Sequence, residues 1–366
     1  MQILADPQIP LVSEAFAEFG EVRLLPGREW GRDDVAGADI LLVRSVTPMN
    51  EALLAGSAVQ FVGSATSGVD HIDFDYLGRR GIAFAHAPGS NAQSVVEYVL
   101  SALCVLLGER GRGFDGLCVG IVGCGQIGSR LRRVLESQGA RCLVNDPPLQ
   151  EATGGTGFCP LDALADAEVI TVHTPLTQDG PYPTLGLIGA DFLALARDDL
   201  ILINAARGGI VDEAALLQNL RERPGMRAVI DCWENEPRID PALLARAAIA
   251  TPHIAGYGYD GKLRGTEMLY QAACRYFKRP ATWRAPSGIS IKSYSYKIGG
   301  EADPNSALRS LVLDHYDVRA DSDALKGLSG EPPPALAAGF DRLRKHYPER
   351  REYSAAAVCC QDLGNV

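Results

Sequence analysis

The stretch Leu117-Cys-Val-Gly-Ile-Val-Gly-Cys-Gly-Gln-Ile-Gly128 decides the fold of this chain. Its apolar run at 119–122 predicts a buried strand, which the Gly-x-Gly-x-x-Gly turn ends sharply. Apolar residues then recur at helical spacing, at Ile127, Leu131, Val134 and Leu135. A strand, a glycine turn and a helix in this order indicate a dinucleotide-binding unit. In such a unit the glycines allow a tight turn, a close backbone approach to a pyrophosphate, and close packing of the helix on the strand.

An acidic residue completes this unit. The next predicted strand, residues 141–146, ends in Asp146, 18 residues after Gly128, where an acid is expected to accept a hydrogen bond from the ribose 2′-hydroxyl. With no arginine beside it, this acid favours NAD over NADP. The alternative is a glycine-rich surface turn and a surface aspartate. The residues expected at the cofactor are Gly123, Gly125, Gln126, Ile127, Gly128 and Asp146.

Composition narrows the class of protein. At 366 residues the chain is long enough for two or three domains. Its net charge of −10 argues against a surface for nucleic acid or anionic membrane, so an anionic substrate needs a local cluster of cations. Nine cysteines without paired spacing predict reduced thiols and a cytoplasmic protein. The most apolar segment, residues 95–107, is too short to span a bilayer, and the strand pattern at 2–5 leaves no expected secretory signal.

Strand-like and helix-like segments alternate along the chain, which predicts an α/β fold with doubly wound parallel sheets, Rossmann-like or flavodoxin-like. In the first part, strands are expected at 2–5, 39–44, 60–63 and 81–85, with helices at 11–19 and 50–54. After the glycine turn, strands are expected at 141–146, 167–173, 200–204, 226–230 and 249–250.

These patterns predict three domains: a discontinuous substrate-binding domain at 1–92 and 257–284, an NAD-binding domain at 93–256, and a small α+β domain at 285–366. A helix from about Leu263 returns the chain to the first domain, and an alternating pattern at 289–298 predicts a strand in the tail. Residues 91–107 predict a helix that is apolar on most of its circumference. Such a helix is buried, either between domains or against a second subunit.

Three ionisable residues, Arg207, Glu236 and His253, stand at successive strand ends of the second predicted sheet. Oxidation of a 2-hydroxy acid needs a cation for the carboxylate, a base for the hydroxyl proton and a hydride acceptor. Arginine offers a planar fork, histidine exchanges a proton near neutrality, and a glutamate on the other ring nitrogen fixes the tautomer. Taken singly, each residue has another interpretation. Arg207 fits a cap on a carbonyl group, Glu236 fits a turn acid before Pro237, and His253 fits a packed loop histidine. Together at one sheet edge they predict a catalytic set.

Polar residues also follow two strands of the first predicted sheet. Arg44 and Ser45 follow one strand, and Ser64-Ala-Thr-Ser-Gly68 follows the next. Because the carboxyl ends of parallel strands meet at one edge, both segments are expected at the same crevice. Arg44 is there either a ligand-binding residue or a solvated surface arginine.

Five motifs together resemble the D-2-hydroxyacid dehydrogenase superfamily over residues 1–280. They are Gly-x-Gly-x-x-Gly at 123–128, His173-Thr-Pro-Leu-Thr177, Ile203-Asn-Ala-Ala-Arg-Gly208, Asp231-x-Trp-Glu-x-Glu-Pro237 and Thr251-Pro-His-Ile-Ala-Gly256. Further segments are similar to the branch that oxidises 4-phospho-D-erythronate in vitamin B6 biosynthesis: Val43-Arg-Ser-Val-Thr47, Gly63 to His71, Ala87-Pro-Gly-Ser-Asn91, Asn145-Asp-Pro-Pro148, Gln178 to Thr184, Asp341 to Lys345 and Glu349 to Tyr353. Residues 287–297 match that branch poorly.

The resemblance implies a role for each matched position. Arg207 would bind the substrate carboxylate, His253 would be the acid and base, and Glu236 would support it. Implied substrate contacts are Arg44, Ser45, Thr66, Ser67, Gly68 and Tyr257. Further implied NAD contacts are Thr174, Ala205, Ala206, Asp231 and Gly256, with Asp231 at the nicotinamide carboxamide. The resemblance also implies a homodimer formed through the tail. The apolar helix at 91–107 is a second candidate surface, and no metal site is expected from the residues.

Two other functions fit the same motifs. One is a related dehydrogenase of the phosphoglycerate or glyoxylate/hydroxypyruvate type, although the tail lacks the pattern of a regulatory amino-acid-binding domain. The other, less favoured, is an NAD-sensing binding protein of the co-repressor type. A cluster of basic tail residues also leaves two readings open, surface ion pairs or ligands for the substrate phosphate of a dimer partner: Arg342, Arg344, Lys345, Arg350 and Arg351.

Overall fold

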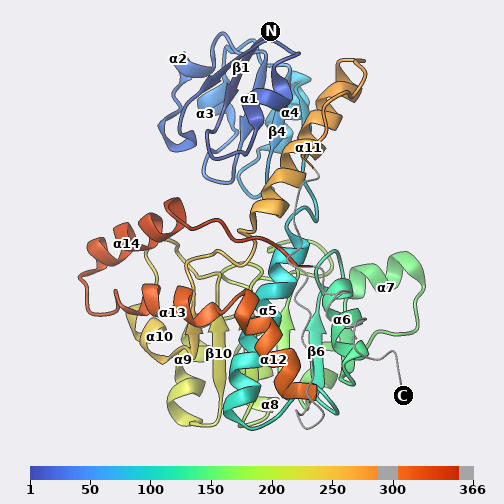
Figure 1. Ribbon diagram of the computed structural model, residues 1–366, viewed down its shortest axis with the longest axis vertical. Coiled ribbons are helices and arrows are strands. Elements are labelled where there is room, and N and C mark those ends of the chain that lie inside the picture. Colours follow the sequence, from blue (N-terminus) through green and yellow to red (C-terminus); the bar gives the residue numbers. More distant parts are fainter. Residues whose placement is uncertain (287–303, 354–366) are drawn as a thin grey trace. The chain divides into compact units, whose positions relative to one another are not determined.

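The computed structural model describes residues 1–286 and 304–353. These residues form two compact units, each with its own parallel sheet (Figure 1). The first unit contains residues 1–91 and 257–286, and the second contains residues 92–256 and 304–353. The predicted α/β fold with two parallel sheets is thereby confirmed.

The first unit has a five-stranded sheet in the order β2-β1-β3-β4-β5, the order of flavodoxin-like folds. Its strands are β1 Gln2–Ala5, β2 Glu21–Leu24, β3 Ile40–Val43, β4 Phe61–Ser64 and β5 Ala83–His86, and every pair is parallel. Sequence reasoning missed β2. This edge strand is largely exposed and carries no apolar run, so it lacks the signal by which its neighbours were recognised.

Alternate residues of each strand serve opposite layers of this unit. Ile40 and Leu42 of β3 pack in one core with helices α1 Val12–Phe16 and α11 Tyr259–Tyr276. Leu41 and Val43 pack in a second core on the other face. The short helices that supply this second core are α2 Arg32–Val35, α3 Glu51–Leu54 and α4 Phe74–Arg80. Burial on both faces explains why these strands read as continuous apolar runs.

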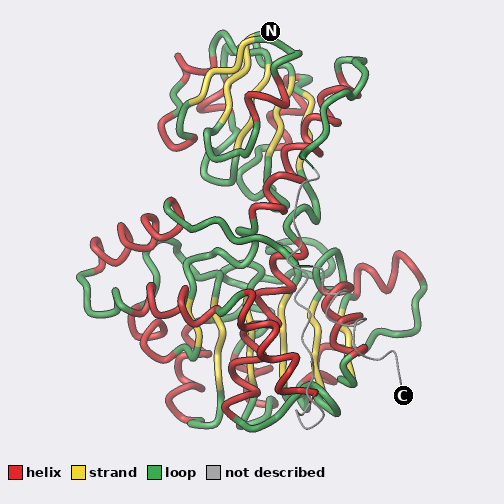
Figure 2. Tube along the Cα trace, viewed as in Figure 1, coloured by secondary structure: helices red, strands yellow, loops and turns green. Residues whose placement is uncertain are grey.

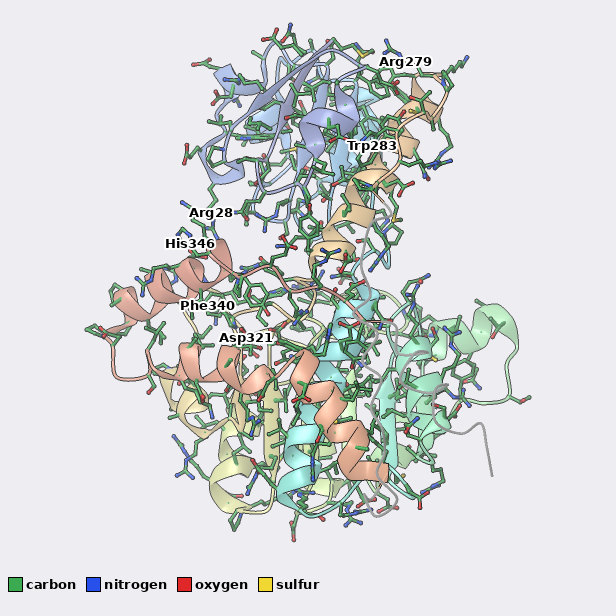
Figure 3. All side chains as sticks on the ribbon, viewed as in Figure 1. Arg28, Arg279, Trp283, Asp321, Phe340 and His346 are labelled. Carbon is green, nitrogen blue, oxygen red and sulfur yellow. The ribbon has the colours of Figure 1, made fainter. Side chains whose placement is uncertain are left out.

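The long helix α11 starts at Tyr259, four residues before the expected start. It brings Leu269 and Tyr270 into the first core. Trp283, after the helix, packs edge-on against Tyr270 with ring centroids 5.7 Å apart and donates a hydrogen bond to the Glu14 carboxylate (Figure 3). These contacts fasten residues 257–286 to the N-terminal part of the unit.

The second unit has a six-stranded parallel sheet in the order β11-β10-β9-β8-β6-β7. Its strands are β6 Cys118–Val122, β7 Arg141–Asn145, β8 Val169–Val172, β9 Ile201–Asn204, β10 Arg227–Ile230 and β11 Ile249–Ala250. Because β7 and β8 flank β6 on opposite sides, the winding of the chain reverses at β6, and ligands of such sheets bind at the carboxyl ends there.

Helices cover both faces of this sheet (Figure 2). They are α5 Ala92–Glu109, α6 Gly128–Ser137, α8 Ala190–Leu195, α9 Glu213–Glu222 and α10 Pro241–Arg246. A further helix, α7 Pro147–Thr153, follows β7 and buries none of its residues. Every residue of β8 and of β9 is buried, which a strand achieves only when both faces are covered.

Helix α5 is a core helix of the second unit. Every residue from Ser94 to Leu107 is buried, and the helix packs against α6, α12 and α13 of the same unit. At 18 residues it is longer than the expected apolar segment, and by length and composition it is the one helix among the described residues that could cross a membrane, but 83% of it is buried inside the protein. The chain itself covers this helix, and its suggested role as a second dimer surface stays a prediction.

The described part of the tail is helical and belongs to the core of the second unit. Its helices are α12 Pro304–His315, α13 Val318–Lys326 and α14 Pro333–Lys345. The Ser322 hydroxyl of α13 accepts a hydrogen bond from the Ala250 N–H of the edge strand β11, at 3.1 Å. Leu325, Leu336 and Phe340 join the same hydrophobic core as residues of α9 and α10, and Figure 3 labels Phe340 on α14. The strand expected at 289–298 lies outside the described residues, as do Cys359 and Cys360, so the α+β character and the start of the tail at residue 285 stay predictions.

Candidate active site

The glycine turn after β6 is shaped by close backbone contacts. Gly123 has a φ of 88°, and a Cβ built on it would lie 2.8 Å from the backbone of His173. A Cβ on Gly128 would lie 2.0 Å from the Gly123 carbonyl oxygen, so a side chain there would push α6 off the strand. A Cβ on Gly125 would meet nothing within 4 Å. Gly123 therefore allows the tight turn and Gly128 allows close packing of α6 on the strand, as expected. Gly125 leaves an open backbone surface.

Asp146 lies beside this turn. One carboxylate oxygen accepts a hydrogen bond from the Cys124 N–H at 2.7 Å, and the other caps α7 by accepting from the Leu149 N–H at 3.0 Å. A carboxylate has about four lone-pair sites, so two backbone bonds leave room for a ribose hydroxyl. An open glycine surface at the start of α6 and an acid beside it together fit the pyrophosphate and ribose of a dinucleotide.

The three predicted catalytic residues line one cavity of about 390 Å³ in the second unit. Arg207 follows β9, Glu236 follows β10 and His253 follows β11, so adjacent strands bring all three to one edge of the sheet. The other lining residues come from the same loops and from residue 185: Leu185, Gly208, Gly209, Trp233, Glu234 and Asn235. The predicted convergence of these side chains is what the fold produces.

Glu236 and His253 form a hydrogen-bonded pair. Nδ1 of His253 lies 2.8 Å and 3.0 Å from the two carboxylate oxygens of Glu236, and Glu236 also accepts from the Trp233 N–H at 2.9 Å. Burial alone would raise the pKa of Glu236. His253, the Trp233 N–H and the charge of Arg344 hold that pKa below its ordinary value instead. An ionised Glu236 can only accept, so the proton lies on Nδ1 and the Nε2 lone pair is available to a substrate.

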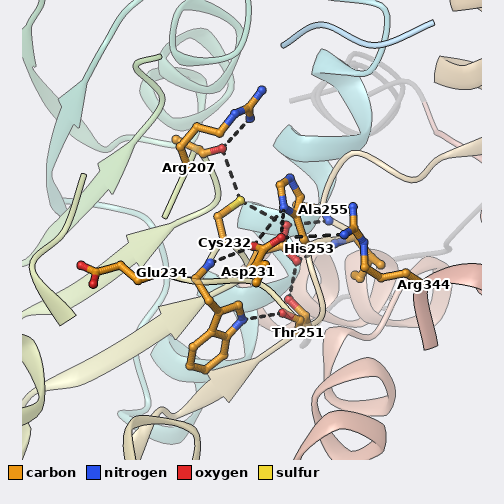
Figure 4. A network of polar contacts seen from close by, with 12 residues as sticks. Arg207, Asp231, Cys232, Glu234, Thr251, His253, Ala255 and Arg344 are labelled. Atoms are coloured by element: carbon orange, nitrogen blue, oxygen red, sulfur yellow. Dashed lines mark hydrogen bonds and ion pairs between the residues drawn. The ribbon is translucent and has the colours of Figure 1, made fainter. Parts of the chain in front are cut away.

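A buried carboxylate holds the loop that carries His253 (Figure 4). Asp231 accepts hydrogen bonds from the Thr251 hydroxyl and from the N–H groups of Ile254 and Ala255, at 2.7 to 2.9 Å. His253 itself has a φ of 56°, a strained conformation for a residue with a Cβ, which persists only where the surroundings impose it. Both carboxylate oxygens of Asp231 are thus engaged inside the protein, and its expected contact with nicotinamide stays a prediction.

The loop after β9 is fixed in a similar way. The Asn204 side chain donates hydrogen bonds to the carbonyl oxygens of Arg207 and Cys232, at 2.9 and 3.2 Å, and so ties this loop to the next one. A Cβ on Gly208 would lie 1.9 Å from the Trp233 carbonyl oxygen, so only glycine fits between the two loops. Ala205 and Ala206 are buried, and the half-buried Arg207 donates to the Ala206 carbonyl oxygen at 2.7 Å.

A second histidine stands at a strand end of this sheet but differs in chemistry. Burial lowers the pKa of His173 to about 3, so its ring is neutral at physiological pH. Its Nε2 lies 2.9 Å from the Thr171 hydroxyl, and its buried Nδ1 has no hydrogen-bond partner among the residues that the structure describes. The neighbouring Thr174 is half-buried and borders the glycine turn at Gly123. His173 is therefore a neutral histidine next to the glycine turn, whereas His253 has a carboxylate partner.

The Glu236–His253 pair also has a thiol neighbour. The possible ligand atoms of Cys232, Glu236 and His253 all lie within 4.8 Å of one another. Burial and the charges of Asp231 and Glu236 raise the pKa of Cys232 well above its usual value, so the thiol keeps its proton. With the imidazole already bonded to Glu236, this is a poor donor set for a metal ion.

The predicted substrate residues belong to the first unit. Arg44, at the end of β3, lies 4.0 Å from the Asp6 carboxylate, bonds the Gln8 side chain and donates to the Tyr257 hydroxyl at 3.4 Å. Lys262 of α11 lies over the Tyr257 ring, with its Nζ 4.5 Å from the ring centroid. Two cations therefore gather around one tyrosine. Sequence reasoning missed Lys262, because it lies on a helix rather than in a strand-end motif.

The loop after β4 brings the remaining substrate candidates together. The Thr66 hydroxyl donates to the Gly68 carbonyl oxygen at 2.9 Å, and the Ser67 hydroxyl donates to the Asn91 side chain at 2.8 Å. Ser45 is exposed beside Arg44. Gly256 and Tyr257 are half-buried, at the junction where the chain passes from the second unit to the first.

This chain is similar to known proteins over nearly its whole length. An erythronate-4-phosphate dehydrogenase of Salinibacter ruber is 48% identical to this chain. The matched region spans 98% of this chain and 94% of that relative. Relatives of the same description from Azotobacter vinelandii and Serratia proteamaculans are 46% and 45% identical, cover 98% and 100% of this chain, and are themselves covered to 94% and 97%.

Family models match two parts of this chain, and its fold is similar to those of solved dehydrogenase structures. The family model described as the NAD binding domain of D-isomer specific 2-hydroxyacid dehydrogenases matches residues 107–255, and a domain of unknown function, DUF3410, matches residues 292–365. The fold is similar to a D-lactate dehydrogenase from Aquifex aeolicus, with a TM-score of 0.63 and 24% identity over 76% of this chain and 96% of that one. A 3-phosphoglycerate dehydrogenase of Entamoeba histolytica gives a TM-score of 0.64 and 24% identity over 78% and 98%. At these identities the two structures support the fold alone.

Proposed function

This chain belongs to the erythronate-4-phosphate dehydrogenases, a family within the D-isomer specific 2-hydroxyacid dehydrogenases, and we propose that it oxidises 4-phospho-D-erythronate to 2-oxo-3-hydroxy-4-phosphobutanoate with NAD. This reaction serves the biosynthesis of pyridoxine, vitamin B6. The observation that carries the proposal is the cavity shared by Arg207, Glu236 and His253, with an ionised Glu236 on Nδ1 of the histidine.

The chemistry follows from these three side chains. Arg207 binds the substrate carboxylate, because a guanidinium matches its two oxygens. Nε2 of His253 takes the proton of the C2 hydroxyl, and the carboxylate of Glu236 stabilises the imidazolium that forms. Bound NAD supplies the acceptor for the hydride that leaves C2. Loss of a proton and a hydride converts the alcohol to a ketone, and His253 releases its proton to solvent before the next turnover.

We assign the cofactor to the turn between β6 and α6. We assign the pyrophosphate to the backbone of Gly123, Gly125 and Gly128 and the ribose hydroxyls to Asp146. The flanking assignments to Gln126, Ile127, Thr174, Ala205, Ala206, Asp231 and Gly256 are part of the same proposal.

The substrate phosphate is assigned to cations of the first unit. The protein carries a net charge of −10, so a dianionic phosphate needs a local concentration of positive charge. Arg44 and Lys262, gathered around Tyr257, offer that charge, and Ser45 and the loop at 66–68 offer hydroxyl and backbone donors.

The molecule is further proposed to be a cytoplasmic homodimer joined through its tail. The cysteines among the described residues are free thiols, as expected in a reducing compartment. Light scattering of the full chain tests the dimer, and a monomer at micromolar concentration would contradict it.

Initial rates of NAD reduction with four acids test the reaction: 4-phospho-D-erythronate, D-erythronate, 3-phospho-D-glycerate and D-lactate. We expect the highest kcat/KM for 4-phospho-D-erythronate. Arg44→Gln should raise the KM for the phosphorylated acid while changing the rate with D-erythronate little. Equal rates for all four acids, or a preference for 3-phosphoglycerate, would refute the substrate assignment.

A further inference from the structure

Helix α14 of the tail brings an arginine to the catalytic pair. A guanidinium nitrogen of Arg344 lies 3.8 Å from the Glu236 oxygen that also lies 2.8 Å from Nδ1 of His253 (Figure 4). The two side chains are only 15% and 18% exposed. Charges so little exposed to water interact more strongly than surface ion pairs, which contribute little. The contact therefore matters to the electrostatics of Glu236.

Several other titratable groups act on Glu236. His253 contributes a hydrogen bond and positive charge when protonated, Cys232 is a protonated thiol, and Glu213 of α9 interacts with Glu236 as a like charge. Arg344 differs from them because an arginine keeps its positive charge over the whole physiological pH range. It is a constant source of positive potential at this carboxylate.

Packing against the core of the second unit fixes the position of α14. Leu336 and Phe340 are buried in the core of the second unit, and Arg344 lies over the Phe340 ring, 5.9 Å from its centroid. Gly339 makes this fit possible, since a Cβ there would lie 2.4 Å from the Leu328 side chain. Arg344 is thus presented to Glu236 by a packed helix rather than by a surface loop.

The residues after α14 reach the same loop from another direction. The buried Arg350 donates hydrogen bonds to the carbonyl oxygens of Ala255 and Ile254, directly after His253, and its guanidinium lies 4.3 Å from the Tyr316 ring centroid. Asp321 of α13 accepts from the hydroxyls of Tyr316 and Tyr347, at 2.7 and 2.8 Å (Figure 3). The tail is therefore docked at the catalytic loop of its own chain.

We propose that Arg344 is a positioning residue of the dehydrogenase, which keeps Glu236 ionised and aimed at His253, so that the tail completes the acid–base pair within one chain. This inference rests on the catalytic roles proposed above for Glu236 and His253. It gives the tail a part in catalysis that is separate from joining two subunits.

The proposal predicts a shift in the pH dependence of catalysis. Loss of the Arg344 charge removes positive potential from the Glu236–His253 pair, so the pair takes up a proton at higher pH and the base for the C2 hydroxyl is lost there. The acid limb of the kcat/KM profile for oxidation should therefore move to higher pH in Arg344→Gln, by about one unit, the lower end of the effect of an opposite charge within 4–6 Å. Arg344→Lys keeps the charge and should restore most of the wild-type profile.

Steady-state rates from pH 5 to 9 test this on the full chain. Arg319→Gln is the matched control, because Arg319 is an exposed tail arginine paired with Asp317, and its profile should equal that of the wild type. Circular dichroism and melting curves verify that each variant is folded. In a Glu236→Gln background, Arg344→Gln should leave the acid limb where it is, because the charge acts through Glu236. An additional shift in the double variant, or an unshifted limb in Arg344→Gln alone, would overturn the proposal.

Failure of this inference is distinguishable from failure of the proposed function. If His253→Ala retains wild-type turnover, the acid–base assignment itself is wrong. If His253→Ala is inactive while Arg344→Gln and Arg319→Gln share the wild-type profile, only the role of Arg344 is wrong. A loss of activity in Arg344→Gln that lysine does not rescue and that leaves the limb unmoved would also refute it, since it would make Arg344 a packing residue.

Discussion

His253 and Glu236 are joined through Nδ1 of the imidazole, which lies 2.8 Å from Oε2 of the carboxylate, while the ring also lines the cavity that contains Arg207. This arrangement assigns the two ring nitrogens to different tasks. Nδ1 is held by the protein, and Nε2 is left for chemistry. The positive φ of His253 and the grip of Asp231 on the following N–H groups show how much of the surrounding structure serves this one orientation.

Removal of the imidazole should abolish proton transfer while leaving the cofactor site intact. We expect His253→Ala to lower kcat by 10²- to 10⁴-fold, the usual contribution of general acid–base catalysis. The dissociation constant of NADH, measured by fluorescence titration, should stay within about twofold because the glycine turn and Asp146 are untouched. Turnover close to that of the wild type would show that another group is the base.

The geometry of Arg207 should matter as much as its charge. Arg207→Lys keeps a cation but loses the planar fork that matches a carboxylate. We expect kcat/KM to fall roughly 10- to 100-fold. This loss is similar to the net contribution of one hydrogen bond to a charged group, about 1.5 to 3 kcal/mol. Steady-state kinetics with 4-phospho-D-erythronate measure this. If lysine performs as well as arginine, the carboxylate is not clamped at Arg207.

Most of the fold could be predicted because its signals are local. Apart from β2 and the two-residue β11, the strands of both sheets are largely apolar runs of four or five residues, and each catalytic candidate lies in the loop that follows a strand. The exceptions have physical reasons. β2 is an exposed edge strand, and α7 contains two prolines and a single leucine and buries none of its residues. Neither carries the periodic apolar pattern on which sequence reasoning depends.

The parts of the site that escaped prediction depend on packing between distant segments. Arg344 meets Glu236 because α14 packs against the core with Phe340, and nothing in the spacing of the basic tail residues reveals that contact. The tail cluster was expected either as surface pairs or as phosphate ligands. Arg351 does form an exposed pair with Glu349, whereas Arg350 is buried against backbone carbonyls. Three arginines of one basic cluster therefore have three different kinds of partner: Arg344 the little-exposed Glu236 carboxylate, Arg350 backbone carbonyls and Arg351 an exposed carboxylate.

The choice between NAD and NADP should depend on Asp146. Its carboxylate is expected to accept from the ribose hydroxyl and to repel a 2′-phosphate. Asp146→Ala should reduce the ratio of kcat/KM for NAD over NADP by about tenfold or more, equivalent to 1.4 kcal/mol. Because Asp146 also caps α7, Asp146→Asn, which can still cap the helix, is the better-folded control. An unchanged ratio in both variants would place ribose recognition elsewhere.

Glu213 should make stability depend on pH. Burial, followed by the neighbouring charges of Glu234, Asp240 and Glu236, raises its pKa to about 7. The unfolded chain ionises Glu213 near pH 4.3, before the folded protein does, so stability falls as pH rises from there to about 7. Glu213→Gln can still accept from the Glu234 N–H, as the wild type does at 2.7 Å, without the charge.

The variant should therefore be more stable than the wild type at pH 8 by roughly 1 to 2 kcal/mol, after a discount for partial exposure, and nearly equal at pH 4.5. Urea unfolding at the two pH values gives the comparison. A stability difference that does not grow with pH would mean that Glu213 is ionised in the folded protein over the whole range.

Two glycines of one turn should separate cofactor binding from folding. A Cβ on Gly128 would lie 2.0 Å from the backbone oxygen of Gly123, so Gly128→Ala must displace α6 and should lower the free energy of unfolding by roughly 1 to 3 kcal/mol, as overpacking does.

A Cβ on Gly125 would meet no protein atom within 4 Å, so Gly125→Ala should melt within about 1 °C of the wild type. The same methyl group would occupy the surface assigned to the pyrophosphate, so the NADH dissociation constant should rise about tenfold or more. Gly37→Ala, at an exposed glycine whose added Cβ also meets nothing within 4 Å, is the control for both measurements. Normal NADH binding by a folded Gly125→Ala protein would show that the pyrophosphate does not approach this turn closely, and the assignment of the cofactor to the β6–α6 turn would then be wrong.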